Sequence, residues 1–116
     1  MEEKLLLITK YDGWKVDPEY PEYTFMYKDG AVYELKDLAY LTDLNMLHPV
    51  AMKVKDMLGE IYNNTDRELT IKKDADDIGT TLLVVCSYKP NSKGEYINLF
   101  NSVCEGIELI NRYKNN

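Results

Sequence analysis

The most constraining stretch of this chain is the apolar run Thr80–Tyr88, Thr-Thr-Leu-Leu-Val-Val-Cys-Ser-Tyr. In an extended strand, successive side chains point to opposite faces of a sheet. Both faces of this run would be apolar at the centre, with Leu82 and Val84 on one and Leu83 and Val85 on the other. The short length, the β-branched residues and the proline that follows favour a strand over a buried helical segment. We therefore expect a central strand that is covered on both sides.

Two further segments predict the other strands. Tyr23–Lys28 and Ala31–Leu35 flank Asp29-Gly30, a pair that favours the positive φ angles of a tight hairpin turn. Arg67–Lys73 alternates between polar and apolar residues, which predicts a strand with one face in water, and Asp74–Gly79 would be the loop into the central strand. On the hairpin, the alternation places one set of side chains on one face, namely Phe25, Tyr27, Val32 and Glu34.

Helical periodicity marks the remaining segments. Glu3–Asp12 is interpreted as a short helix that Gly13 stops, although a strand over Lys4–Thr9 is the alternative. Apolar residues at spacings of three and four predict a helix over about Thr42–Tyr62, and a last helix covers about Glu95–Lys114. The predicted buried stripes are Leu44, Leu47, Ala51, Val54, Leu58 and Ile61 in the first of these two, and Phe100, Val103, Cys104, Ile107 and Ile110 in the second.

Pro49 is irregular within the second predicted helix. A proline inside a helix removes a backbone donor and clashes with the carbonyl four residues earlier. Either regular helix begins near His48 or the helix is kinked at the proline. Thr42 or Asp43 is suited to cap its start.

The order of these elements, α-β-β-α-β-β-α, predicts the fold class. Short connections within each pair of strands indicate a mostly antiparallel sheet of four strands. The expected fold is α+β, a three-layer α-β-α sandwich that forms a single domain over residues 1–116.

The charge of the chain bears on its partners. The net charge is −6, and residues 1–50 hold five Lys against ten Asp and Glu. Such a chain is unsuited to direct binding of nucleic acid, which depends on clustered Lys and Arg. No apolar run is long enough to span a bilayer and the N-terminal residues do not resemble a secretory signal, so we expect a cytoplasmic protein in a bacterial host cell, without a membrane partner. Cys86 and Cys104 are expected as reduced thiols in the core, with a disulfide between them as the alternative.

The sequence contains no motif that predicts catalysis, a metal site or a cofactor. His48 is the only histidine, and Asp43 is the only acid near it that is suited to orient it as a general base. One histidine and two apolar cysteines do not make a zinc site. The acidic run Asp74–Gly79 lacks the ligands that a calcium loop needs at its fifth and twelfth positions. We therefore expect no catalytic residue, no metal and no cofactor.

Aromatic residues near the N-terminus give the candidate binding surface. Tryptophan and tyrosine are enriched at the energetic centres of protein interfaces. The candidate partner-binding residues are Trp14, Tyr20, Tyr23 and Tyr27. Trp14 follows a predicted helix stop, so a role in closing the edge of the core is the alternative.

Several stretches together resemble a known family. They are Tyr11-Asp12-Gly13-Trp14, the Tyr-Lys-Asp-Gly hairpin, the segment Tyr40–Val50, and Ile110-Asn111-Arg112-Tyr113 in the last helix. This set resembles the phage α-β-α sandwich domain family, which includes small proteins of phages, prophages and Bacteroides-type genomes. The resemblance implies a three-layer fold and an origin in a phage or mobile element, and it implies no activity.

The expected function is that of a small phage-type accessory protein that acts through protein–protein contacts. One alternative is an acidic mimic of DNA, or another modulator of a nucleic-acid process. A second alternative is a small-molecule-binding protein or enzyme with its site near His48. If the outer strand of the hairpin is unpaired, it also predicts a homodimer or strand addition by a partner.

Overall fold

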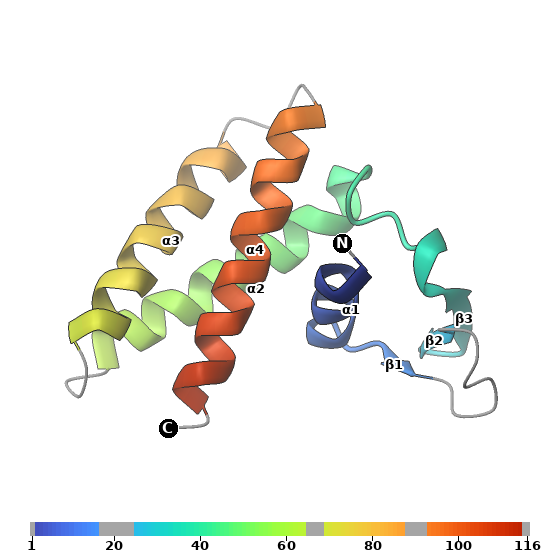
Figure 1. Ribbon diagram of the computed structural model, residues 1–116, viewed down its shortest axis with the longest axis horizontal. Coiled ribbons are helices and arrows are strands. Elements are labelled where there is room, and N and C mark those ends of the chain that lie inside the picture. The colour runs from blue at the N-terminus through green and yellow to red at the C-terminus, as the bar shows by residue number, and fades with distance from the viewer. Residues whose placement is uncertain (1, 17–24, 65–68, 88–92, 115–116) are drawn as a thin grey trace.

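The computed structural model describes residues 2–16, 25–64, 69–87 and 93–114, and in them it shows a mainly helical chain with a small sheet at one side (Figure 1). The elements, in chain order, are helix α1 (Glu2–Tyr11), strands β1 (Lys15–Val16), β2 (Phe25–Lys28) and β3 (Ala31–Glu34), a 3-10 turn η1 (Leu35–Asp37), and helices α2 (Leu44–Asn64), α3 (Leu69–Ser87) and α4 (Lys93–Lys114). The sheet has three antiparallel strands in the order β1-β2-β3. The predicted three-layer α-β-α sandwich with four strands is therefore wrong.

Helix α3 is the element that overturns the predicted fold. The predicted strands Arg67–Lys73 and Thr80–Tyr88 and the predicted loop Asp74–Gly79 form one continuous helix over their described residues. Ala75 and Leu82 are buried and Ile78 is half-buried. These three residues follow one another at spacings of three and four, as on one face of a helix. The spacing continues across the acidic residues Asp76 and Asp77. Burial of this stripe outweighs the local preference of β-branched residues for a strand.

Helix α1 ends as the sequence predicts. Gly13 has a φ of +98°, a left-handed conformation that favours glycine. The Gly13 amide donates to the Lys10 carbonyl at 3.1 Å and the Trp14 amide donates to the Thr9 carbonyl at 3.0 Å. This pair of bonds is a Schellman motif, which satisfies the last carbonyls of the helix and turns the chain sharply. The alternative of a strand over Lys4–Thr9 is wrong.

The hairpin is confirmed at its turn and in the facing of its side chains. Asp29 and Gly30 have φ angles of 52° and 83°, as a tight hairpin turn requires. Phe25 pairs with Glu34 and Tyr27 with Val32, so these four side chains share one face of the sheet. Met26 lies on the other face and is fully buried. The sheet therefore has an inner face towards the core and an outer face.

Helix α2 begins at Leu44, so Pro49 lies inside it and does not delay its start. Asp43 is the cap, because its Oδ1 accepts a hydrogen bond from the Asn45 amide at 2.9 Å. The predicted stripe of α2 is confirmed, with all members buried except Leu44, which is half-buried.

The core lies where α2, α3 and α4 pack against one another, and α1 packs against α4. The predicted buried residues of α4 are confirmed, namely Phe100, Val103, Cys104, Ile107 and Ile110. Lys4 Nζ of α1 donates to Asn101 Oδ1 of α4 at 3.1 Å. The first and the last described helices therefore lie side by side (Figure 1).

Gly106 lets α4 lie close to both of its neighbours. A Cβ atom at this position would overlap Val54 Cγ1 of α2 and would come within 3.3 Å of Leu58 Cδ1. It would also come within 3.5 Å of Ile78 Cγ2 of α3. The missing side chain thus sets the distance between three helices.

Candidate functional site

Trp14, the first candidate residue, lies in a hydrogen-bonded cluster. Its side chain is half-buried and its Nε1 donates to Tyr40 Oη at 3.1 Å. Its ring meets the Tyr33 ring edge-on, with centroids 5.8 Å apart, and Lys28 Nζ lies 6.0 Å from the Trp14 ring centroid. The indole thus bridges the segment after α1, the hairpin, and the loop before α2.

Tyr40 and Asp12 form the centre of this cluster. Tyr40 is fully buried, and its hydroxyl donates to Asp12 Oδ2 at 2.5 Å. Lys28 Nζ and Lys53 Nζ lie 3.7 Å and 3.5 Å from the Asp12 carboxylate, on the hairpin and on α2 respectively. Burial raises the pKa of Tyr40 strongly, and the Asp12 carboxylate raises it further. The hydroxyl therefore stays protonated and acts as a fixed donor that ties the sheet to the helices.

Tyr27, the other candidate that the structure describes, does not join this cluster. Tyr27 is 38% exposed and lies on the outer face of the sheet, whereas the Trp14 ring contacts Tyr33, which belongs to the inner face. Tyr20 and Tyr23 lie outside the described residues. The structure therefore separates Trp14 from Tyr27, and a binding role for any of the four stays a prediction. Strand β3 is an edge of the described sheet, and self-pairing through it also stays a prediction.

His48 shows no catalytic arrangement in the described part of the chain. It lies half-buried on α2, and no hydrogen bond or ion pair joins its side chain to another described residue. His48 lines neither the hollow between α2 and α3 nor the one between α3 and α4. Among the same residues, no group of three or more His, Cys, Asp or Glu side chains is arranged to hold a metal ion.

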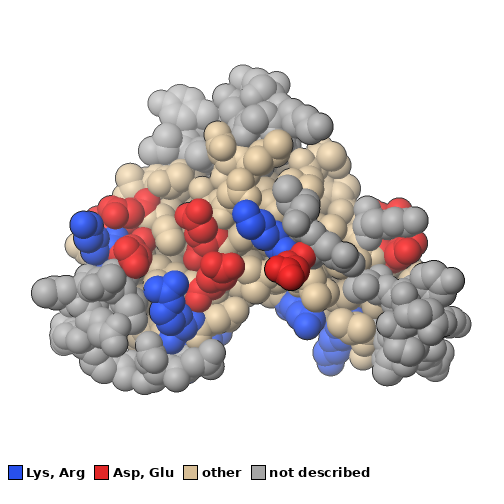
Figure 2. All heavy atoms as spheres, in the orientation of Figure 1, with Lys and Arg blue, Asp and Glu red and all other residues tan. Residues whose placement is uncertain are grey.

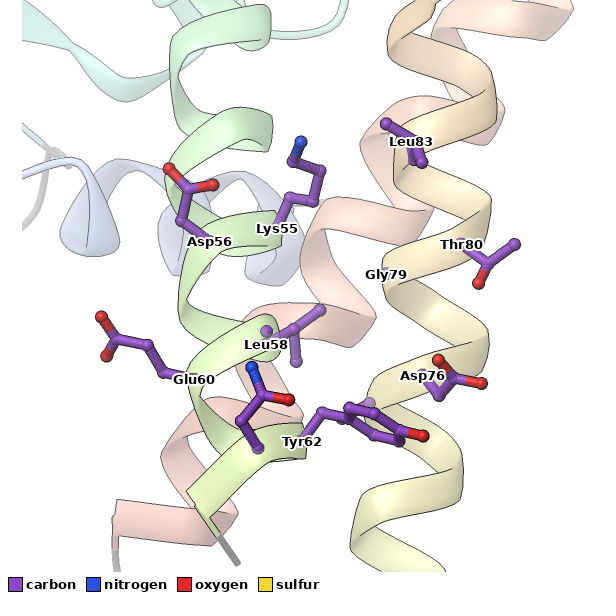
Figure 3. Close-up of a pocket in the computed structure, with 12 residues that line it drawn as sticks. Lys55, Asp56, Leu58, Glu60, Tyr62, Asp76, Gly79, Thr80 and Leu83 are labelled. Atoms are coloured by element: carbon purple, nitrogen blue, oxygen red, sulfur yellow. The ribbon is translucent and has the colours of Figure 1, made fainter.

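A groove lies between α2 and α3 on the described surface. It has a volume of about 470 Å³ and is lined by Lys55, Asp56, Leu58, Gly59, Glu60, Tyr62 and Asn63 from α2 and by Ala75, Asp76, Gly79, Thr80 and Leu83 from α3. Figure 3 shows Leu58, Tyr62 and Leu83 lying between the two helices. Tyr62 is 46% exposed and Leu83 is 51% exposed. The groove thus presents large apolar side chains to solvent above a buried floor.

Two glycines keep this groove open. A Cβ atom at Gly59 or at Gly79 would have no heavy atom within 4 Å, in contrast to Gly106. Val54 and Ile78, which face Gly106 of α4, do not line the groove, whereas Leu58 faces Gly106 and also belongs to the groove floor. Helix α4 therefore lies beneath this floor, and in Figure 3 the ribbon of α4 passes behind both helices.

A second, smaller hollow lies between α3 and α4. It has a volume of about 300 Å³, and its charged lining residues are Asp74, Asp77, Glu105, Glu108 and Arg112. Figure 2 shows acidic side chains gathered over these two helices. These carboxylates come from residues after 50, whereas the acidic-mimic alternative rests on the charge of residues 1–50. That alternative stays a prediction.

The sequence did not indicate the residues of the groove, because α3 was interpreted as two strands and a loop. The signal was present in the spacing of four between Ala75, Gly79 and Leu83, which places all three on one face of a helix. Tyr62 lies in the polar last turn of α2 and is not part of a recognisable sequence motif. A groove between two helices becomes visible only when both helices are recognised.

No protein family, curated protein or solved structure matches this chain. The resemblance to the phage α-β-α sandwich domain family therefore stays a prediction, and the three-layer fold that it implies is wrong for the described residues. Among the helices that the structure describes, none combines the length and apolar character needed to cross a membrane.

Cys104 is a buried free thiol, as predicted, and the side chain of Cys86 lies outside the described part. The pKa of Cys104 is raised to about 12, chiefly by burial, while Lys4 lowers it and Glu108 and Glu105 raise it. Because the thiolate is the reactive form, we expect iodoacetamide at pH 8 to modify Cys104 roughly 100-fold or more slowly in the folded protein than in urea. Peptide mapping by mass spectrometry measures both rates at this residue. Equal rates would show that Cys104 is accessible in the folded state.

Proposed function

We propose that this chain is a non-catalytic protein-binding domain whose groove between α2 and α3 receives an amphipathic α-helix of a partner protein. The observation that carries the proposal is the groove itself. It has an apolar floor, open space beside Gly59 and Gly79, and the two large exposed side chains of Tyr62 and Leu83. Partially exposed apolar surface of this kind is typical of binding sites.

The shape of the groove favours a helix as its occupant. Helix α4 already packs on the other side of the α2–α3 pair, so a further helix would complete a four-helix arrangement. The lining residues span Lys55–Asn63 and Ala75–Leu83, which corresponds to about 12 Å, or two turns, along each helix. Amphipathic helices bind such grooves through apolar residues spaced three and four apart.

A groove-filling substitution tests this proposal. Gly79→Leu places an apolar side chain in the groove, where a Cβ meets no other atom, and it adds helix propensity. We expect this variant to remain folded and to lose at least tenfold in affinity for 18-residue helical peptides that carry a leucine stripe. Asn111→Leu, at an exposed position of α4 outside the groove, is the matched control and retains binding.

Binding is measured by fluorescence anisotropy, and two-dimensional NMR locates it. Peptide-induced shifts confined to α2 and α3 and lost in Gly79→Leu would support the proposal. If no leucine-stripe peptide binds, or if Gly79→Leu and Asn111→Leu bind equally, the proposed function is wrong. Circular dichroism melting of each variant separates lost binding from lost folding.

A further inference from the structure

The charges around the α2–α3 groove carry an inference about the occupant, which rests on the proposed function. Asp56 and Glu60 lie on α2 and point away from α3, as Figure 3 shows, and Asp76 lies on α3. Lys55 is the one basic residue among the groove residues described, which include these three carboxylates. Negative charge therefore lies on the outer edge of α2 and on α3, to either side of the apolar strip.

We propose that the partner helix is basic, with Lys or Arg residues on both flanks of its apolar stripe. A helix laid into the groove places its stripe against Leu58, Tyr62 and Leu83. Its flanking positions then lie over the two acidic rims, where a cation is attracted and an anion is repelled. Acidic rims also discriminate against apolar helices with acidic flanks, so they determine which helices bind.

The occupant is a helix of a different protein rather than of a second copy. In α1, α2 and α4 the numbers of basic and acidic residues are equal, and α3 has one acidic residue in excess. None of these four described helices therefore has the positive charge that the rims favour.

Three helical peptides test the inference. They share the same leucine stripe and differ only at the flanking positions, which are Lys, Gln or Glu. At 50 mM salt we expect the Lys peptide to bind roughly tenfold more tightly than the Glu peptide, with the Gln peptide between them. At 0.5 M salt the difference shrinks, because exposed charges are screened over a few ångströms. Gly79→Leu abolishes binding of all three.

Neutralising the rim separates a local effect from net charge. We expect Glu60→Gln and Asp76→Asn each to reduce the Lys-over-Glu preference about twofold. Glu108→Gln removes the same charge from an exposed position on α4 that does not line the groove, and it leaves the preference nearly unchanged. Equal effects of all three variants would show that only the overall charge matters, and would overturn the inference.

The outcomes distinguish this inference from the proposed function. Equal binding of the Lys and Glu peptides, still blocked by Gly79→Leu, would overturn the basic partner and leave the helix-binding function standing. Absence of binding by all three peptides would overturn both. A dimer of the chain alone in analytical ultracentrifugation that Gly79→Leu abolishes would identify a second copy as the occupant, and would overturn the basic partner.

Discussion

Gly106→Ala is expected to lower the free energy of unfolding by about 1–3 kcal/mol. The new methyl group would overlap Val54 and crowd Leu58, both of which are buried, so α4 must move away from α2 or these side chains must leave their preferred rotamers. The gain in helix propensity, about 1 kcal/mol for alanine over glycine, is too small to offset a larger overlap. Urea denaturation followed by circular dichroism measures the change.

Two other glycines provide the matched controls for this substitution. Gly59→Ala and Gly79→Ala add the same methyl group to helices at positions where it meets no atom within 4 Å. Each is expected to raise the free energy of unfolding by about 0.5–1 kcal/mol. A stabilising effect of Gly106→Ala would contradict the close approach of α4 to α2 at this residue.

Tyr40→Phe is expected to lower the free energy of unfolding by about 1–3 kcal/mol at neutral pH. The substitution removes one hydroxyl and leaves Trp14 Nε1 without its acceptor and Asp12 without its hydroxyl donor. Tyr27→Phe removes the same group from a partly exposed side chain and is expected to change stability by less than about 0.5 kcal/mol. Equal effects of the two substitutions would contradict the structural role of Tyr40.

The effect of Tyr40→Phe also depends on pH. The pKa of Tyr40 is raised in the folded state, so folding favours the protonated hydroxyl. Its contribution to stability is fully present below about pH 10, the ordinary pKa of tyrosine, and is lost as the pH rises above that value. The stability difference between the original chain and Tyr40→Phe should therefore narrow above about pH 10. Denaturation curves at pH 8 and above pH 10 test this, and a difference that widens would contradict the raised pKa.

Local signals predicted individual elements, although the fold class predicted from them is wrong. Gly13 and Asp29-Gly30 mark a helix end and a hairpin turn that require positive φ angles, and both lie where the sequence places them. The stripes of α2 and α4 are long and regular, so their helical period dominates. The residues of α3 carry two conflicting signals, because Thr80–Ser87 favours a strand locally while the spacing of Ala75, Ile78 and Leu82 is helical.

The candidate sites were less predictable, because they depend on contacts between distant segments. Trp14 was recognised as a notable residue, but its partner Tyr40 lies 26 positions later in a loop without periodicity. The α2–α3 groove was not predicted, because its α3 wall was interpreted as strands. The sequence did not indicate Gly106, because an apolar stripe is recognised by its large side chains. The close contact between the helices at Gly106 instead requires that no side chain be present.

The packing of α1 against α4 has a consequence for how the chain folds during synthesis. The Lys4–Asn101 bond and the contact between Cys104 Sγ and the Lys4 carbonyl join residues 97 and 100 positions apart. Helix α1 leaves the ribosome before the other three described helices, yet its packing surface on α4 is incomplete until α4 has emerged. Closing so long a loop is slow compared with forming local contacts. The apolar face of α1 that packs on α4 is therefore exposed to other proteins until α4 has been made.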